Sequence, residues 1–182
     1  MISITYNVNC YRELLNNTIK ENDTVIEIGP HTGKYMKNYI NRTCLTVAVD
    51  KAEQSENSIK NLKTKNKFKN LKFIRGDVRS FETVKKVLDE VKKCDVLCVD
   101  MGGGRYPDTV FKVWAVWSGI FKPRDSIIRN RGLGEFIRRA RVKDISITRE
   151  FDDSGWMETY GRSIPYKLKK QMDEFEFWVD VE

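Results

Sequence analysis

The sequence predicts an α/β protein in which a mostly parallel sheet is covered by helices on both faces. Three observations support this fold class. Segments with helical spacing of apolar residues alternate with short β-branched runs, a pattern typical of parallel sheets. Glycine or aspartate follows the first four of these runs. The chain has 182 residues, which fits a single domain with its own core.

The first half of the chain opens with a helix over residues 8–20, because Tyr11, Leu15 and Ile19 recur at helical spacing. Short apolar and β-branched runs then predict strands at 24–28 and 45–49. Residues 34–41 between them have the spacing of a short helix. We therefore expect residues 1–21 to form a leading helix that precedes the sheet.

The same alternation continues through the second half of the chain. It predicts helices at 53–65 and 81–92, a helix that begins near Pro107, a helix at 133–141, and strands at 71–74, 96–99 and 126–128. Residues 145–151 and 175–181 alternate with period two and predict a final antiparallel pair. Within the single domain of residues 1–182, residues 22–143 then form the α/β core, and residues 144–182 form the terminal pair with its connection.

Composition restricts the classes of function. No apolar run approaches the ~20 residues of a membrane span, and the start lacks a basic stretch followed by an apolar one. We therefore expect a cytoplasmic protein that does not bind membranes. Four scattered cysteines and one histidine predict no metal site, because structural zinc takes its ligands in close pairs.

The net charge of +7 is concentrated in two segments. Residues 51–79 carry nine basic and three acidic side chains, and residues 122–143 carry eight basic and two acidic ones. The second segment is rich in arginine, which suits bidentate contacts with phosphate. It favours an anionic partner such as RNA, whereas the lysine-rich first segment is equally typical of a solvated surface.

The residues that directly follow the predicted strands are the candidates for chemistry, since ligands of such sheets bind at the carboxyl ends of the strands. Gly29 and Gly33 allow the backbone to approach a ligand and turn into a helix. Asp50 is placed to accept hydrogen bonds from the two hydroxyls of a ribose. Asp77 could accept a hydrogen bond from an adenine amino group, and Asp100 follows the fourth strand.

Together these segments resemble the class I S-adenosylmethionine-dependent methyltransferase family over residues 22–181. The segments are VIEIGPHTG (25–33), VAVD (47–50), RGDV (75–78) and DVLCVD (95–100). They are similar to the family motifs that face, in this order, the methionine, the ribose, the adenine and the transferred methyl group. The resemblance implies a three-layer α/β/α sandwich whose seven-stranded sheet ends in an antiparallel pair, with S-adenosyl-L-methionine as the cofactor.

The resemblance also implies a set of cofactor-binding residues. They are Glu27, Gly29, Pro30, His31, Gly33, Asp50, Lys51, Asp77, Val78 and Asp100. The chain departs from the family pattern at His31, which replaces the usual middle glycine of the first loop. A nicotinamide cofactor is disfavoured, because Gly29 and Gly33 do not form GxGxxG and a pyrophosphate would face Glu27.

Methyl transfer depends mainly on how the acceptor is positioned, sometimes with a base that removes its proton. Asp100 is the candidate catalytic residue for either role. The candidate substrate-binding residues are Arg105, Tyr106, Arg129, Asn130 and Arg131, and Trp156 and Tyr160 could stack on a base. We expect RNA as the acceptor. A small anionic metabolite and a non-catalytic cofactor-binding subunit stay open as alternatives, as do a protein partner and a homo-oligomer.

Overall fold

The computed structural model describes residues 1–102, 105–143, 165, 166, 168–170, 172 and 173. Six described strands form one sheet in the order β1-β6-β5-β2-β3-β4, and all neighbours in it are parallel. The strands are β1 (Ile2–Thr5), β2 (Thr24–Ile28), β3 (Leu45–Asp50), β4 (Leu71–Arg75), β5 (Val96–Val99) and β6 (Asp125–Arg129).

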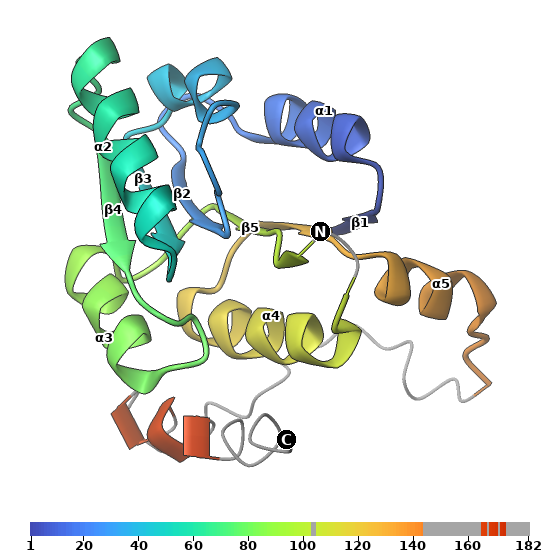
Figure 1. The fold of residues 1–182 in the computed structure, drawn as a ribbon. Coiled ribbons are helices and arrows are strands. Elements are labelled where there is room, and N and C mark those ends of the chain that lie inside the picture. Colours follow the sequence, from blue (N-terminus) through green and yellow to red (C-terminus); the bar gives the residue numbers. More distant parts are fainter. Residues whose placement is uncertain (103–104, 144–164, 167, 171, 174–182) are drawn as a thin grey trace.

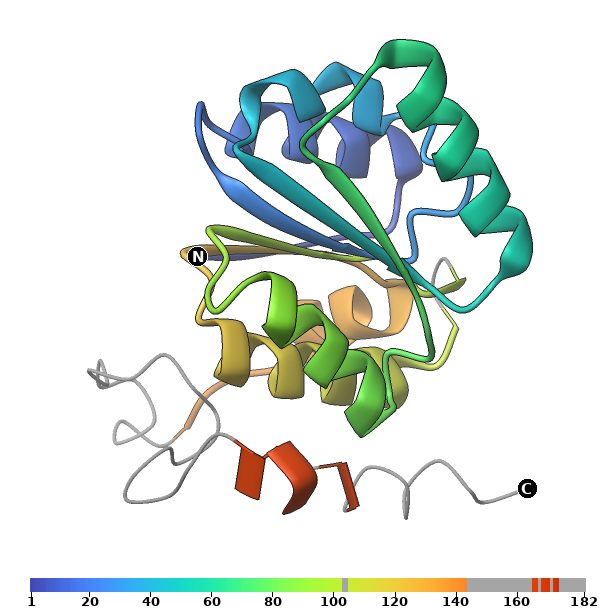
Figure 2. The same ribbon diagram turned by 90° about the vertical axis from the view of Figure 1, so that its left-hand side faces the viewer.

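Helices cover both faces of this sheet and make three layers (Figures 1 and 2). The helices are α1 (Val8–Thr18), α2 (Glu53–Asn66), α3 (Phe81–Glu90), α4 (Pro107–Phe121) and α5 (Arg131–Arg139). Two 3-10 turns, η1 (Met36–Asn38) and η2 (Ile40–Arg42), lie between β2 and β3. The helix α1, the two turns and α2 cover one face, and α3, α4 and α5 cover the other.

Successive side chains of the central strands point to opposite faces, which divides the core into two clusters. In β2, Val25 packs on the side of α1, whereas Ile26 packs on the side of α3 and α4. The strands are apolar almost throughout for this reason, as expected of a parallel sheet buried on both faces. Leu168 and Met172, from the region beyond the α/β core, are buried in the cluster on the side of α3 and α4.

The strand β1 does not form part of the sequence prediction, which begins at the first helix. Its four residues pair in parallel with β6, so that Ile2 lies opposite Ser126 and Thr5 lies opposite Arg129. All four are at least partly exposed, and the partner strand comes near the end of the α/β core. A short, half-exposed run with a distant partner gives only a weak local pattern.

The prediction of seven strands with a terminal antiparallel pair is not confirmed. The described sheet has six strands, all parallel, and the segments 145–151 and 175–181 lie outside the described residues. The other five predicted strands agree with β2 to β6 to within one residue at each end. The helix predicted at 34–41 is instead the pair of 3-10 turns, separated at Tyr39 (φ −127°).

The strand order changes direction at β2, which positions the functional site. β3 and β4 lie to one side of β2, and β5, β6 and β1 lie to the other. The carboxyl ends of β2 and β5 therefore border the switch point, where open α/β sheets bind ligands. At the opposite ends of the strands, Arg124 ties β6 to the start of β2 by two hydrogen bonds to Asp23, of 3.0 and 2.9 Å.

None of the helices among the described residues is long and apolar enough to cross a membrane. In the same parts of the chain, no group of three or more His, Cys, Asp or Glu side chains could hold a metal ion.

Candidate active site

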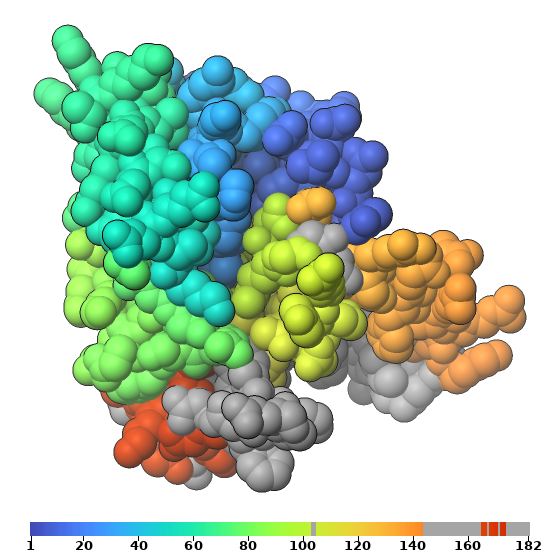
Figure 3. All heavy atoms as spheres, viewed as in Figure 1, coloured from blue at the N-terminus to red at the C-terminus, as the bar shows by residue number. Residues whose placement is uncertain are grey.

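A pocket of about 920 Å³ opens at the carboxyl edge of the sheet, within the usual size of a small-molecule site. Nine residues predicted from the sequence line it, namely Gly29, His31, Asp50, Lys51, Asp77, Val78, Asp100, Tyr106 and Arg129. They come from the ends of five different strands and from the start of α4. In Figure 3 the surface is hollowed between the atoms of α2 and those of the segment before α4.

Gly29 brings the loop after β2 against the loop after β5. Its φ is +74°, and a Cβ at this position would lie 2.1 Å from the Asp100 carbonyl oxygen. Only glycine adopts this conformation without strain and leaves room for the neighbouring backbone. The Gly29 N–H also donates to the Val49 carbonyl oxygen at 2.9 Å, so the loop is fixed to two neighbouring strands.

His31 lies in the same loop with a φ of +52°, in the left-handed region that favours glycine. This accounts for the glycine that the family usually has there. The side chain is exposed and lines the pocket. The loop of this chain therefore keeps the glycine-like backbone turn and adds an imidazole to the pocket wall.

Asp50 ends β3 and binds the start of α2 through its side chain. Its two carboxylate oxygens accept hydrogen bonds from the Ala52 N–H and from the Ser55 hydroxyl, both at 2.9 Å. An ionised carboxylate has about four lone-pair positions. Asp50 therefore keeps acceptor capacity toward the pocket while these two bonds hold its side chain in place.

Asp77, after β4, is held by Arg79. The guanidinium donates to it through Nε at 2.9 Å and Nη2 at 2.7 Å. These hydrogen bonds hold the pKa of Asp77 below its usual value, so the carboxylate stays ionised. The next residue, Val78, accepts a hydrogen bond of 2.8 Å at its carbonyl oxygen from Nε1 of buried Trp117. This bond fixes the loop to α4.

Asp100 and Arg129 form an ion pair in the pocket wall. The Arg129 Nη1 atom lies 3.1 and 3.0 Å from the two oxygens of Asp100, and both side chains are about four-fifths buried, with 19% and 21% exposure. The Arg129 Nε donates to the Tyr6 carbonyl oxygen at 3.1 Å. The residue after β1 therefore helps to orient the arginine that holds the catalytic candidate.

Glu27 is buried beside the pocket and does not line it. Its side chain accepts a hydrogen bond from the hydroxyl of Tyr39, which is itself fully buried. Burial raises the pKa of Glu27 to about 7; the Tyr39 hydrogen bond opposes this rise and the Asp100 carboxylate adds to it. The structure therefore assigns Glu27 to the layer behind the glycine loop, on the side of α1 and η1.

Five other predicted residues lie outside the pocket lining, namely Pro30, Gly33, Arg105, Asn130 and Arg131. Asn130 is fully buried. Its Oδ1 accepts from the Leu133 N–H at 3.0 Å, which caps α5, and its Nδ2 donates to the Arg105 carbonyl oxygen at 3.0 Å. These bonds give Asn130 a positioning role, since they fix the segment that leads into Tyr106.

The pocket also contains residues that the sequence prediction does not include. Ile28, Val49 and Met101 add apolar surface, and Asp108 and Thr109 add polar groups from the first turn of α4. The sequence held one relevant signal for the last two, because a predicted helix that begins at proline presents its first turn to the same sheet edge.

Comparison with known families gives a match over most of the α/β core. The family model described as FtsJ-like methyltransferase matches residues 12–132, which include β2 to β6 and all nine predicted residues of the pocket lining. No curated protein sequence matches the chain significantly.

Solved structures share the fold at low sequence identity. An rRNA methylase from Streptococcus thermophilus has a TM-score of 0.55 at 11% identity, and the match covers 74% of this chain and 80% of that one. A dimethyladenosine transferase from Plasmodium falciparum has a TM-score of 0.54 at 18% identity, covering 78% of this chain and 48% of that one. The chain spans only 53%, 33% and 28% of three other matched structures.

The family match agrees with the fold, the switch-point pocket and the strand-end acids. It also confirms the predicted class of cofactor, S-adenosyl-L-methionine. The chain belongs to the FtsJ-like methyltransferase family.

Proposed function

We propose that this protein transfers a methyl group from S-adenosyl-L-methionine to RNA. The observation that carries the proposal is the composition of one pocket, which combines the glycine loop, the acids after β3 and β4, and the pair of Asp100 with Arg129. The glycine loop and the two acids suit the cofactor, and the pair of Asp100 with Arg129 suits a methyl acceptor. The arginine-rich segment that follows β6 supports an acceptor with phosphate groups.

The pocket fits the cofactor by its own chemistry. Gly29 and His31 bring the backbone of the glycine loop to the pocket wall, Asp50 retains acceptor capacity for ribose hydroxyls, and Val78 offers apolar surface beside Asp77. When bound, the cofactor supplies an activated methyl group on a sulfonium. The chain's own residues must then bind the acceptor and orient its nucleophilic atom.

Asp100 is the residue we assign to the acceptor. Its carboxylate can accept a hydrogen bond from the hydroxyl or amino group that receives the methyl group and can take up the proton that this group loses. Arg129 cannot take up a proton, because a guanidinium stays charged in proteins. Its role is to hold the Asp100 carboxylate in one orientation.

Cofactor binding is the first part to test, by calorimetric titration with S-adenosylmethionine and S-adenosylhomocysteine. Asp50→Asn keeps the size of the side chain that binds the start of α2 but removes its charge, so affinity should fall about 10- to 100-fold through weaker hydrogen bonds to the ribose. Asp89→Ala, at an exposed position of α3, is the control and should bind as the wild type does. Failure of the folded wild type to bind either compound would contradict the proposal.

Methyl transfer is the second part, measured with methyl-labelled S-adenosylmethionine and total cellular RNA. Asp100→Asn should lower turnover about 100-fold or more while cofactor affinity is kept. Unchanged turnover would exclude Asp100 from the reaction, and binding without transfer to any acceptor would favour a non-catalytic subunit. A small anionic metabolite differs from RNA in its salt dependence, since an RNA that contacts several cations loses affinity steeply as salt rises.

A further inference from the structure

A pair of side chains outside the pocket lies beside its acceptor end. Tyr6 directly follows β1, and Arg131 begins α5 directly after Asn130 and β6. Because β1 and β6 are parallel neighbours, with Thr5 opposite Arg129, the residues after the two strands meet at the same edge of the sheet. The Arg131 guanidinium carbon lies 5.7 Å from the centre of the Tyr6 ring.

We propose that Tyr6 and Arg131 form a stacking platform for a nucleobase of the RNA that carries the methyl acceptor. This inference rests on the proposed function. It assigns a site to the acceptor strand rather than to the cofactor. Unpaired bases of RNA stack on aromatic rings and on arginine planes, which is the chemistry that these two side chains present.

The platform is open to solvent and fixed in place. The Tyr6 side chain is half exposed, at 51%, and Arg131 is exposed. The Tyr6 carbonyl oxygen accepts a hydrogen bond from the Arg129 Nε at 3.1 Å. The Arg129 guanidinium also contacts both oxygens of Asp100. Two contacts thus connect the platform to the catalytic candidate, so a base bound there would hold its neighbouring nucleotide at the pocket.

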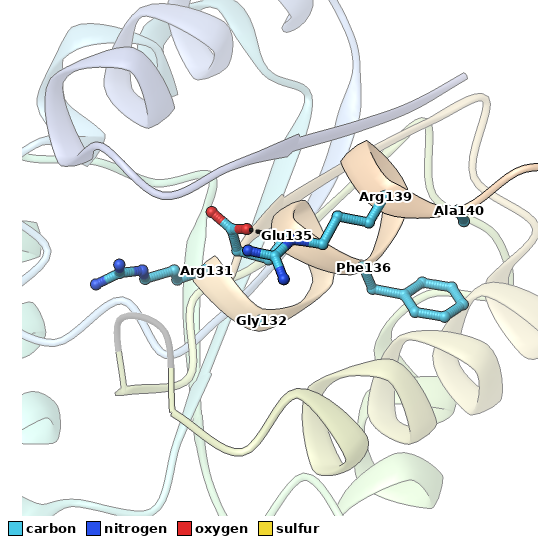
Figure 4. Close-up of a pocket in the computed structure, with 6 residues that line it drawn as sticks. All are labelled: Arg131, Gly132, Glu135, Phe136, Arg139 and Ala140. Carbon is cyan, nitrogen blue, oxygen red and sulfur yellow. Dashed lines mark ion pairs between the residues drawn. The ribbon is translucent and has the colours of Figure 1, made fainter.

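The surface continues from the platform onto α5, where a second depression of about 640 Å³ shares no lining residue with the cofactor pocket. Figure 4 shows Arg139 reaching toward Glu135, with Arg131 at the same side of the helix; the Arg139 Nε lies 3.3 Å from the carboxylate. Phe136 points away from them and is 69% exposed.

The charge of this surface favours nucleic acid over an acidic protein segment as the occupant. Glu135 is the one acid between residues 129 and 143, against six basic side chains. Arginines spaced along an exposed helix suit the repeated phosphates of a strand, and the planar pair at its start suits a base. A strand bound in this way would pass from the phosphate contacts of α5 over Tyr6 and Arg131 to Asp100.

Fluorescence anisotropy with a short, labelled single-stranded RNA tests the platform without requiring turnover. Tyr6→Ala should weaken binding about 5- to 100-fold through loss of stacking, with the salt slope unchanged. Tyr6→Phe keeps the ring and should bind as the wild type does. Arg131→Ala should weaken binding and reduce the slope of log affinity against log salt by about 0.7.

Lys85→Ala is the matched control. The Lys85 ammonium lies 5.3 Å from the centre of the Phe81 ring on α3, next to β4 at the far end of the sheet. Its loss removes one cation from above an aromatic ring, as Arg131→Ala does, but should leave RNA affinity unchanged. All variants should keep their affinity for S-adenosylhomocysteine.

The outcomes separate the two proposals. A wild type that binds RNA, with Tyr6→Ala binding equally well, would overturn the platform and leave the RNA acceptor in place. Equal weakening by Tyr6→Ala and Tyr6→Phe would also overturn it, since stacking needs only the ring. A folded wild type with no measurable affinity for RNA would overturn the RNA acceptor and the platform together, while cofactor binding would still support a methyltransferase of another acceptor.

Discussion

Replacement of Glu27 by glutamine tests the electrostatics behind the glycine loop. Burial raises the pKa of this carboxyl from its ordinary value of 4.5 to about 7 in the folded protein. The folded state therefore holds the proton more tightly than the unfolded chain does, and stability falls as pH rises between these two values. One pKa unit corresponds to 1.36 kcal/mol, so the ionised carboxylate destabilises the fold at pH 8 by on the order of 3 kcal/mol.

The measurement is urea unfolding of wild type and Glu27→Gln at pH 5 and pH 8 without cofactor. Glutamine keeps an acceptor for the Tyr39 hydroxyl and cannot ionise. The stability of the variant relative to wild type should therefore rise between the two pH values by on the order of 3 kcal/mol. Any change in packing cancels in this comparison, because it is the same at both pH values. Glu13→Gln, at an exposed position of α1, should show no such change.

If the free energies of unfolding of wild type and Glu27→Gln differ by the same amount at pH 5 and pH 8, the reasoning is refuted. It would mean that Glu27 ionises in the folded protein as readily as in water, despite an exposure of 6%. The Tyr39 hydrogen bond would then have to offset the whole cost of burial. Tyr39→Phe separates the two contributions, because it removes that hydrogen bond. The free energy of unfolding of this variant should change more between pH 5 and pH 8 than that of wild type.

Three further substitutions test other parts of the fold. In thermal unfolding, Gly29→Ala should cost about 1–3 kcal/mol more stability than Gly102→Ala. Both glycines have positive φ, but only at Gly29 does neighbouring backbone lie where the Cβ would be. Equal costs would contradict the close approach of the two loops. Arg124→Ala leaves buried Asp23 without its guanidinium and should lower the free energy of unfolding by about 1–3 kcal/mol, while affinity for S-adenosylhomocysteine stays the same. Tyr11→Phe should raise stability by about 1 kcal/mol, because the buried Tyr11 hydroxyl has no partner among the described residues; a loss of stability in urea unfolding would show that it has one.

The central strands and the pocket acids were predictable because both follow from local pattern. Buried parallel strands are continuous apolar runs, so β2 and β5 have the predicted bounds. Asp50 and Asp77 lie within a few residues of the carboxyl ends of their strands, which puts both at one edge of the sheet. His31 departs from the family pattern in residue type but not in backbone conformation, since its φ is positive.

The features that sequence reasoning missed depend on pairing between distant segments. Tyr6 meets Arg129 only because β1 joins the sheet beside β6, and nothing within a window of a few residues indicates that pairing. The sequence predicts that Asn130 binds substrate because it follows a strand, but the side chain is buried, caps α5 and donates to the Arg105 carbonyl oxygen. Asparagine is a favoured cap at the start of helices, and this preference was the available signal.

The place of β1 in the sheet has a consequence for how the protein is made. Ile2–Thr5 leaves the ribosome before its partner strand, Asp125–Arg129, and strands β2 to β5 and helices α1 to α4 are synthesised between the two. Until then the first strand has no edge to join, and Arg129 lacks the carbonyl oxygen of Tyr6. The contact that orients Arg129 thus forms only after the central strands have been synthesised, so a nascent chain can pair those strands before Asp100 has its oriented partner.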